Sequence, residues 1–371
     1  MYLKDLSLIN FKNYSQTELN FSPKINCFIG SNGIGKTNLL DAIYYLSMCK
    51  SYLNPVDSQN VRYDEEFFVL QGDYFLNDKH ENIYCGLKKN KKKQFKRNKK
   101  EYQKLSDHIG LLPVVMISPT DNSLILEGSE ERRKFMDSVI SQYDKVYLDN
   151  LIRYNRALVQ RNKLLKDFYQ QRTFDEDTLE IWDEQLIVLG EKIYNVRVKF
   201  VEELIPIFQE YYTRISGNQE KVELIYDSKL HEGDFRDILK SAQEKDRVVQ
   251  HTSVGVHKDD LILNLEKHPI KKAGSQGQQK TFLVSLKLAQ FDFIKLISGF
   301  KPILLLDDIF DKFDRNRVRQ IIELVAENHF GQIFVTDTSQ ERLEEILKDI
   351  NIPHSFFMIN TPENIEIEKI D

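Results

Sequence analysis

The sequence has 371 residues, 41% of them hydrophobic, which is long enough for two or three domains with a sizeable buried core. A formal net charge of −5 argues against a protein that coats nucleic acid over its whole surface. The three cysteines, Cys27, Cys49 and Cys85, form no C-x-x-C pair and indicate free thiols in a reducing compartment. No apolar leader or run approaching the ~18 apolar residues of a membrane span occurs, so we expect a cytoplasmic protein with no membrane partner.

The first predicted elements lead into a glycine-rich loop. Residues 6–10 and 17–21 alternate apolar and polar side chains around Asn13-Tyr14-Ser15, a pattern that predicts a strand hairpin. Residues 25–29, which are apolar except for Asn26, predict a short buried strand. Residues 38–46 place apolar side chains at helical spacing. A strand, a loop and a helix are therefore expected in succession.

The loop between that strand and helix is Gly30-Ser31-Asn32-Gly33-Ile34-Gly35-Lys36-Thr37, which fits the pattern G-x-x-x-x-G-K-[ST]. Such a loop turns consecutive backbone N–H groups toward phosphate oxygens, and the following helix adds its positive N-terminal end. Lys36 is expected to reach the β- and γ-phosphates, and the Thr37 hydroxyl to ligate Mg²⁺. These residues predict a nucleotide site.

A lysine-rich segment, residues 88–104, follows two further predicted strands. It holds ten Lys or Arg against one acid, a local charge of +9 that leaves −14 for the remainder of the chain. Two interpretations stay open: strand hairpins with solvated lysines, or a contact with the phosphate backbone of DNA. The candidate DNA-binding residues are Lys91, Lys92, Lys93, Lys96 and Arg97.

The middle of the chain is predicted to be helical. A buried strand over residues 114–117 runs into Ser118-Pro119, and a helix begins near Ser129. Two longer helices, over residues 148–168 and 181–204, show apolar side chains at helical spacing. About 25 helical residues span only about 38 Å, so we expect an antiparallel arm on a globular head.

A second glycine-containing turn, residues 273–280, opens a predicted helix. Ser275, Gly277 and Gln278 stand at its N-terminus, where a hydroxyl and backbone N–H groups can meet an anion. Considered alone, this turn is more readily interpreted as an ordinary helix cap than as a functional motif.

Two acids follow a later apolar strand. Residues 302–306 are an apolar run that ends in Asp307-Asp308. Asp307 is placed to hold Mg²⁺, and Asp308 to orient an attacking water. The alternative is a pair of ordinary loop aspartates. A further strand, residues 332–336, ends in Asp337, which we expect near the γ-phosphate.

Together these motifs resemble an ABC-type ATPase head of the SMC class, in which Asp311-Lys312-Phe313-Asp314 follows the acidic strand end. Within that class the chain is similar to the RecF family over essentially its whole length. The matching stretches are residues 10–14, 30–38, 118–119, 131–137, 154–158, 160–162, 255–260 and 275–280.

The resemblance implies an α/β fold, an ABC/SMC-type P-loop head with mixed sheets plus a helical arm of short antiparallel helices. The head would comprise residues 1–128 and 250–371, and the arm residues 129–249. Residues 30–38 would bind ATP with Mg²⁺. Two copies would associate head to tail, so that the groups on Ser275, Gly277, Gln278 and Asp314 meet the nucleotide of the other copy.

Function and partners also follow from the resemblance. Family members bind double-stranded DNA and junctions with single strands in an ATP-dependent way. With RecR and RecO they help place RecA on gapped DNA, which implies a weak DNA-dependent ATPase that acts as a switch in replication and repair.

Some positions depart from the wider pattern. Asp308 stands where a transporter ATPase has Glu, and Asp337 where many ABC proteins carry a His; both suggest slow hydrolysis. The loop after residues 114–117 has no obvious Gln, so no residue is assigned its metal-sensing role. Val256 and Lys258 replace Pro and Arg in the family's Gly-Pro-His-Arg-Asp-Asp run, which we expect to be structural more readily than functional.

Three other classes of ATP-binding protein fit these motifs less well. A transporter motor would lack the helical arm and carry a Leu-Ser-Gly-Gly-Gln signature. A nuclease-linked ATPase would need a metal-binding domain after the head, yet only about 35 residues follow Asp337. A small-molecule kinase would leave residues 275–280 unexplained.

Overall fold

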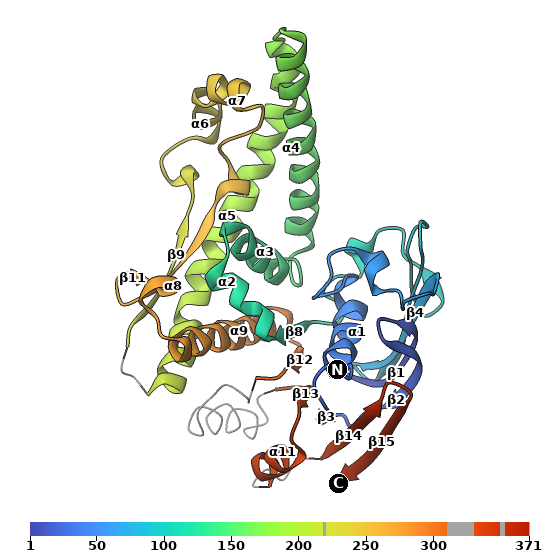
Figure 1. Cartoon of the computed structure of the whole chain (residues 1–371). Helices are drawn as coiled ribbons and strands as arrows, with labels where there is room; N and C mark the ends of the chain where they lie inside the picture. Colours follow the sequence, from blue (N-terminus) through green and yellow to red (C-terminus); the bar gives the residue numbers. More distant parts are fainter. Residues whose placement is uncertain (218–219, 310–329, 349–352, 371) are drawn as a thin grey trace. The chain divides into compact units, whose positions relative to one another are not determined.

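The computed structural model describes residues 1–217, 220–309, 330–348 and 353–370, and the chain divides into two compact units (Figure 1). The sheet unit contains residues 1–122, 211–218 and 276–371. The helical unit contains residues 123–210 and 219–275. The fold is α/β with sheets of mixed strand direction, as the sequence predicts.

The first sheet of the sheet unit is antiparallel and starts from the predicted hairpin. Along it, apolar side chains alternate with polar ones, so that Leu6 opposes Leu19 and Leu8 opposes Leu70 on the buried side. Its strands lie in the order β2 (Tyr14–Asn20), β1 (Tyr2–Phe11), β4 (Phe67–Leu76), β5 (Lys79–Lys88), β6 (Gln94–Arg97) and β7 (Lys100–Glu101).

The second sheet is largely parallel and places the polar ends of its strands together. Its strands lie in the order β15 (Asn364–Ile370), β14 (His354–Thr361), β3 (Ile25–Ile29), β13 (Ile333–Asp337), β12 (Ile303–Leu306) and β8 (Val114–Ile117). From β14 to β8 neighbouring strands run parallel, and β15 is antiparallel. Strands buried on both faces need continuous apolar runs, which explains the sequences of β12 and β8. In β3 the buried Asn26 interrupts the run, and its side chain bonds the Ser22 backbone.

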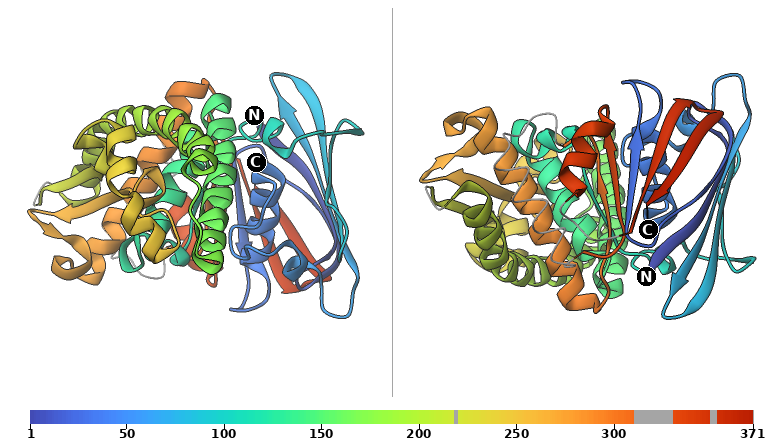
Figure 2. Two further views of the ribbon diagram at one scale, coloured as in Figure 1. Left: turned by 90° about the horizontal axis from the view of Figure 1, so that it is seen from above. Right: turned by 90° about the horizontal axis from the view of Figure 1, so that it is seen from below.

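Helix α1 (Lys36–Met48) lies between the two sheets and contacts strands of both (Figure 2). Its residues from Leu39 to Met48 are all buried, so the predicted one-sided apolar face is only part of its packing surface. Helix α9 (Gln276–Ser298) packs against β8, and α11 (Gln340–Leu347) follows β13. The shorter helical turns of this unit are η1 (Asp57–Asn60), η2 (Leu105–Asp107) and η3 (Pro119–Asn122).

The helical unit is built on two long helices, α4 (Lys145–Gln171) and α5 (Glu176–Ser216). Helix α5 has 41 residues and continues past Pro206, beyond its predicted end at residue 204. Buried side chains of Phe208 and Tyr212 continue the helical spacing beyond the proline, and their packing offsets its missing hydrogen bond. The remaining elements are α2 (Ser123–Leu126), α3 (Ser129–Ile140), β9 (Val222–Asp227), η4 (Lys229–His231), α6 (Phe235–Ser241), α7 (Gln243–Val249), η5 (Val256–Lys258), β10 (Asp260–Leu265), β11 (His268–Pro269) and α8 (Ile270–Ala273).

The compact units differ from the predicted domain limits at residues 250–275. That segment belongs to the helical unit because β10 pairs with β9, with Leu261 opposite Tyr226 and Leu263 opposite Leu224. Residues 123–128 also belong to the helical unit, whereas residues 211–218 at the end of α5 belong to the sheet unit. Periodicity along the chain does not reveal a strand pairing of this kind.

Candidate nucleotide site

The glycine-rich loop is held open by the β1–β2 hairpin. Gly33 and Gly35 have φ values of +79° and +120°, a region that favours glycine. A Cβ atom on Gly35 would lie 2.4 Å from Nδ2 of Asn13, so no side chain fits there. Asn13 Nδ2 donates a hydrogen bond of 2.7 Å to the Ile34 carbonyl, and the Tyr14 hydroxyl donates one of 3.2 Å to the Gly35 carbonyl. The hairpin therefore shapes the loop directly.

Lys36 is directed back into the loop. Its Nζ atom donates to the carbonyl oxygens of Gly30 at 2.7 Å and Ser31 at 3.2 Å, and its side chain is buried. Asn38, two residues further along α1, donates from Nδ2 to Oδ1 of Asn13 at 2.8 Å. The ammonium group thus lies at the loop that is predicted to hold phosphates.

Asp307 and Thr37 meet although they are 270 residues apart in the chain. The Thr37 hydroxyl donates to Asp307 Oδ1 at 2.8 Å, and the Thr336 hydroxyl donates to the same oxygen at 2.9 Å. Ser118 Oγ donates to the other oxygen, Oδ2, at 3.3 Å. One carboxylate with neighbouring hydroxyls fits Mg²⁺, which keeps several waters and takes few protein ligands beside phosphate.

The second acid of the pair has an unusual backbone conformation. Asp308 has a φ of +52°, and its N–H donates to the Thr336 hydroxyl at 2.9 Å. The left-handed turn therefore redirects the chain directly after Asp307. Asp337 has a different setting, because its Oδ1 accepts from the N–H of Ser339 at 2.8 Å at the start of α11.

Ser118 and Thr336 are site residues that motif searching did not assign. Ser118 directly follows β8, and Thr336 is the residue before the last one of β13. These two strands flank β12, and this strand order places both hydroxyls at Asp307. The sequence signal was present, since each stands at the polar end of a buried apolar run. What it lacked was the order of the strands in the sheet.

Ser118 is itself positioned by a buried ion pair. Asp121 Oδ2 accepts the N–H of Ser118 at 2.8 Å, and its Oδ1 lies 2.9 Å from Nζ of Lys287 on α9. The hydroxyl of Tyr52 donates to Asp121, and Lys287 donates to that hydroxyl at 3.1 Å. A small opening of about 50 Å³ beside this cluster is lined in part by Ser118, Asp121, Lys280, Asp307 and Asp308.

A larger hollow of about 700 Å³ opens beside the phosphate loop. Its volume lies in the range of small-molecule sites. Tyr63 on its lining is 94% exposed, which leaves an aromatic face available for stacking. The other lining residues are Lys12, Asn13, Asn38, Leu53, Asn54, Gln59, Val61, Arg62, Asp64 and Glu65.

The second glycine-containing turn stands at the start of α9. The helix begins at Gln276, directly after the exposed Ser275, so Gly277 and Gln278 lie in its first turn. Thr281 donates from Oγ1 to the Gly277 carbonyl at 3.0 Å. This turn therefore stands at a helix N-terminus, where backbone N–H groups can meet an anion. Asp314 falls in residues 310–329, outside the described part of the chain.

The lysine-rich segment is not uniformly available to a partner. Lys93 is only 10% exposed, and its Nζ atom donates to Tyr45 Oη at 3.0 Å, to the Cys49 carbonyl at 2.6 Å and to Asp57 Oδ2 at 2.7 Å. Lys93 therefore joins β6 to the end of α1 and to η1. Lys91 and Lys92 are exposed.

Arg97 and Lys96 are also engaged within the first sheet. Arg97 forms two hydrogen bonds with Glu81, at 2.8 and 2.6 Å, and Nζ of Lys96 lies 5.3 Å from the centre of the Tyr84 ring. The Glu81 carboxylate neutralises much of the charge of Arg97. The exposed positive charge of the segment is therefore carried mainly by lysines other than Lys93 and Lys96.

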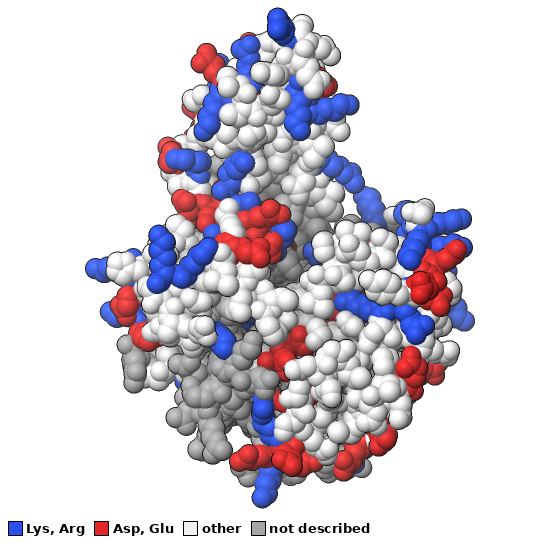
Figure 3. Space-filling model, in the orientation of Figure 1, with Lys and Arg blue, Asp and Glu red and all other residues white. Residues whose placement is uncertain are grey.

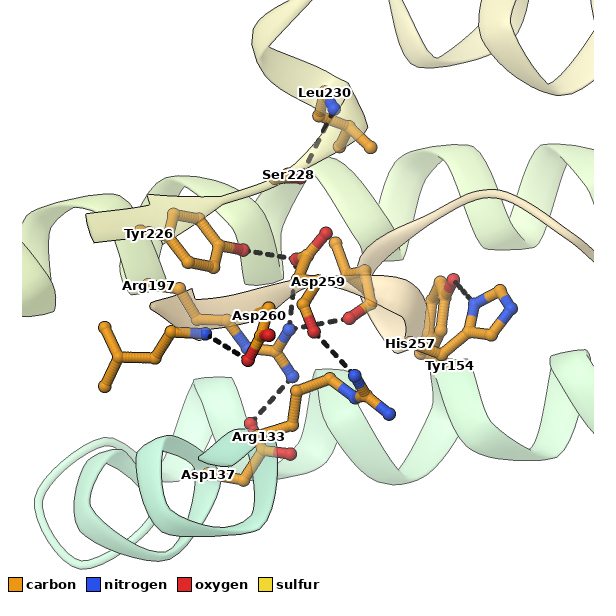
Figure 4. Close-up of polar contacts among 12 residues, drawn as sticks. Arg133, Asp137, Tyr154, Arg197, Tyr226, Ser228, Leu230, His257, Asp259 and Asp260 are labelled. Carbon is orange, nitrogen blue, oxygen red and sulfur yellow. Dashed lines mark hydrogen bonds and ion pairs between the residues drawn. The ribbon is translucent and has the colours of Figure 1, made fainter. Parts of the chain in front are cut away.

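The run from Gly255 to Asp260 is integrated into the helical unit (Figure 4). Arg197, buried on α5, donates to Asp259 Oδ2 at 3.2 Å and to the Val256 carbonyl at 2.7 Å. The Tyr226 hydroxyl also donates to Asp259, and Arg132 on α3 makes a two-point ion pair with Asp260 at 2.6 and 2.8 Å. These contacts join η5 and β10 to α3, α5 and β9. They suit a structural role for residues 255–260.

His257, on η5, joins the same network to α4 through Tyr154. Its Nδ1 atom is 2.8 Å from the Tyr154 hydroxyl, and its Nε2 atom is 3.1 Å from the Thr252 carbonyl. Burial lowers the pKa of His257 to about 4. The imidazole is therefore neutral near pH 7.

These features define the class of protein. A glycine-rich loop between β3 and α1, a hydrogen bond from Thr37 on α1 to Asp307 at the end of β12 and a glycine turn at α9 together form a P-loop ATPase head of the ABC and SMC type. Within the described residues, no helix has the length and hydropathy needed to cross a membrane.

The chain belongs to the RecF family. Residues 2–355 match the family described as RecF/RecN/SMC N terminal domain. The chain is 56% identical over 368 residues to the DNA replication and repair protein RecF of Phocaeicola vulgatus, covering 99% of this chain and 98% of that protein. It is 54% identical over 357 residues to the protein of the same name from Flavobacterium johnsoniae, covering 96% and 99%.

Solved structures agree with this assignment. The structure of the recombination mediator protein RecF-ATP in the RecFOR pathway has a TM-score of 0.88 and 31% identity, covering all of this chain and 98% of that one. An Smc head bound to the C-terminal winged-helix domain of ScpA has a TM-score of 0.60 at 13% identity, covering all of this chain and 98% of that one. The second likeness concerns the fold alone.

Proposed function

We propose that this protein is an ATP-dependent, DNA-binding recombination mediator. The observation that supports it best is the 2.8 Å contact between Thr37 and Asp307 beside the phosphate loop, because this pair fits a magnesium-bound nucleotide. The repair context comes from its relatives, which are RecF proteins of DNA replication and repair.

In this proposal the sheet unit holds ATP through its own residues. The backbone of residues 30–38 receives the phosphates, and Lys36 exchanges its carbonyl partners for phosphate oxygens. Thr37 and Asp307 would hold Mg²⁺, which neutralises phosphate charge when bound. The 700 Å³ hollow beside the loop receives the nucleoside, with Tyr63 at its edge. Asp308 orients a water for slow hydrolysis.

ATP also joins two copies of the chain. Ser275 and the first turn of α9, with Gly277 and Gln278, present a hydroxyl and helix N-terminal groups to an anion. A head-to-tail dimer places these groups, with Asp314, against the γ-phosphate on the other copy. Hydrolysis then acts as a switch that releases the dimer.

The dimer binds double-stranded DNA and junctions between single and double strands. Exposed lysines of residues 88–104, with Lys91 and Lys92 among them, contact the phosphate backbone. With RecR and RecO as partners, the bound dimer helps place RecA at gaps. DNA in turn stimulates a weak ATPase.

One experiment tests the function. The purified full chain is titrated with fluorescent duplex, single-stranded and gapped DNA, with Mg²⁺ and either ATP, a non-hydrolysable ATP analogue or no nucleotide, and its assembly is followed by sedimentation. We expect nucleotide to produce dimers and to strengthen binding to duplex and gapped DNA. Equal DNA binding with and without nucleotide would reject the proposal.

A further inference from the structure

Helix α4 of the helical unit carries a row of exposed basic side chains. Five Lys or Arg residues of this helix are exposed, against one exposed acid, Asp149. The exposed basic residues are Lys145, Arg153, Arg156, Lys163 and Lys166. Figure 3 shows several Lys and Arg side chains at the top of the view, where Figure 1 places the upper part of α4.

The row lies opposite the buried face of α4. At 3.6 residues per turn, the buried residues Tyr147, Tyr154 and Leu165 share one side of the helix. Arg156 and Lys163 project to the other side, because each is offset from those positions by about half a turn, and Lys166 projects to the flank, about a third of a turn away. The buried face anchors the helix, so the basic row rests on a rigid support.

Internal ion pairs leave most of this charge available. Arg153 lies 3.8 Å from Asp149, and both side chains are more than half exposed, so that pair is weak. No ion pair in the described part of the chain involves Arg156, Lys163 or Lys166. We call these three residues the α4 row.

Acidic side chains of the same unit are gathered elsewhere. The first turns of α5 line a hollow of about 230 Å³ with Glu176, Asp177, Glu180, Asp183 and Glu184. Arg236 pairs with Glu184 at its edge. The acids are thus concentrated at the start of α5, where Arg161 of α4 pairs with Asp183 and where Arg236 and Lys240 also line the hollow. The exposed bases lie along α4, to which a polyanion is attracted.

We propose that the α4 row binds the phosphate backbone of duplex DNA. This inference rests on the proposed DNA-binding function and names a contact surface for it. The row from Arg156 to Lys166 spans ten residues, or about 15 Å along the helix axis, which reaches successive phosphates of one strand. Gln160, exposed within this span, adds a hydrogen-bond donor without charge.

The test removes the charge of the row and keeps the helix. The row variant is R156Q/K163Q/K166Q, and Gln has a helix propensity close to those of Arg and Lys. The matched control is K192Q/K199Q/K245Q, which removes three exposed charges of the same unit outside the row. Each protein is titrated with a fluorescent blunt duplex and a non-hydrolysable ATP analogue over a series of salt concentrations.

We expect the row variant to bind duplex about tenfold to a hundredfold more weakly at physiological salt. The slope of log K against log salt should fall by about 0.9 for each lost phosphate contact. The control variant should keep the wild-type slope, and all three proteins should bind the ATP analogue alike. A row variant with the wild-type slope and affinity overturns the inference.

A second measurement does not depend on how the triple variant folds. The native cysteines are buried, so Q160C and K192C each give one accessible thiol for a photocrosslinker. Crosslinks to duplex from position 160 and not from position 192 support the row, and the reverse pattern rejects it. If the wild-type protein binds no duplex with any nucleotide, the proposed function fails, and the inference that rests on it fails too.

Discussion

The Nζ atom of Lys287 lies 2.9 Å from Oδ1 of Asp121, and the two side chains are only 7% and 4% exposed. Lys287 belongs to α9, the helix whose first turn carries Gly277 and Gln278. Asp121 holds the N–H of Ser118, whose hydroxyl contacts Asp307. A continuous polar path therefore joins the helix of the predicted dimer contact to the predicted magnesium residues within one unit.

Removing one partner of this ion pair should lower the free energy of unfolding more than removing both partners. We expect K287M to lower the free energy of unfolding by about 3–5 kcal/mol, because it leaves the Asp121 carboxylate buried without its cation. Urea unfolding measures the change. The double variant K287M/D121N should recover part of the loss, since no unpaired charge remains. Equal losses in the single and double variants would contradict the pairing argument.

Lys36 is predicted to hold the phosphates of ATP. The variant K36A should retain its fold, because the lysine bonds only loop carbonyls in the described structure. It should lose ATP binding, ATP-driven dimerisation and stable DNA binding together. Titration with a fluorescent ATP analogue and sedimentation of the same sample check this. Persistence of ATP-dependent dimers in K36A would count against the proposed function.

A bulky substitution at Ser275 should block dimerisation and leave nucleotide binding nearly unchanged. It precedes α9 and is predicted to contact the nucleotide of a second copy, so S275R should bind ATP nearly as well as the wild-type protein while failing to dimerise. A S275A variant, which removes only the hydroxyl, should be less severe. Loss of nucleotide affinity in S275R with unchanged assembly would refute a contact in trans.

Within the lysine-rich segment, we expect Lys93 to stabilise the fold and Lys91 and Lys92 to contact DNA. We expect K93Q to lower the free energy of unfolding by about 1–3 kcal/mol, because Asp57 and the Cys49 carbonyl lose a nearly buried cationic donor. The double variant K91Q/K92Q should leave stability unchanged and reduce the salt dependence of DNA binding by about 0.9 per contact. An unchanged salt slope would show that Lys91 and Lys92 are solvated side chains that do not contact DNA.

His257 should make the folded state sensitive to acid. Its pKa is lowered to about 4 from an ordinary value of 6.5, chiefly by burial, so the unfolded chain binds the proton more tightly. The stability contribution is present above pH 6.5 and is lost as the pH falls toward 4, by about 2 kcal/mol between pH 7 and pH 5. Urea unfolding of H257Q should show a smaller loss over this range. A loss as large as in the wild-type protein would contradict the assignment.

Much of the fold was accessible from the sequence because its signals are local. The strand, loop and helix around residues 30–37 are encoded by consecutive residues, and the structure confirms their order. The predicted P-loop fold class and the RecF resemblance are confirmed by the family match and the solved structures. The length of α5 was underestimated, because the packing of Phe208 and Tyr212 beyond Pro206 is a tertiary effect.

By itself, the sequence determined the phosphate loop, the acid pair at the end of β12 and the family, since each depends on residue types at short, fixed spacings. Only the tertiary structure decided which side chains meet. The parallel order of β13, β12 and β8 places Thr336 and Ser118 at Asp307. Folding also buried Lys93 in contacts with α1, although its sequence neighbours Lys91 and Lys92 remained exposed. Such pairings depend on strand order and on contacts between distant segments, which local patterns do not encode.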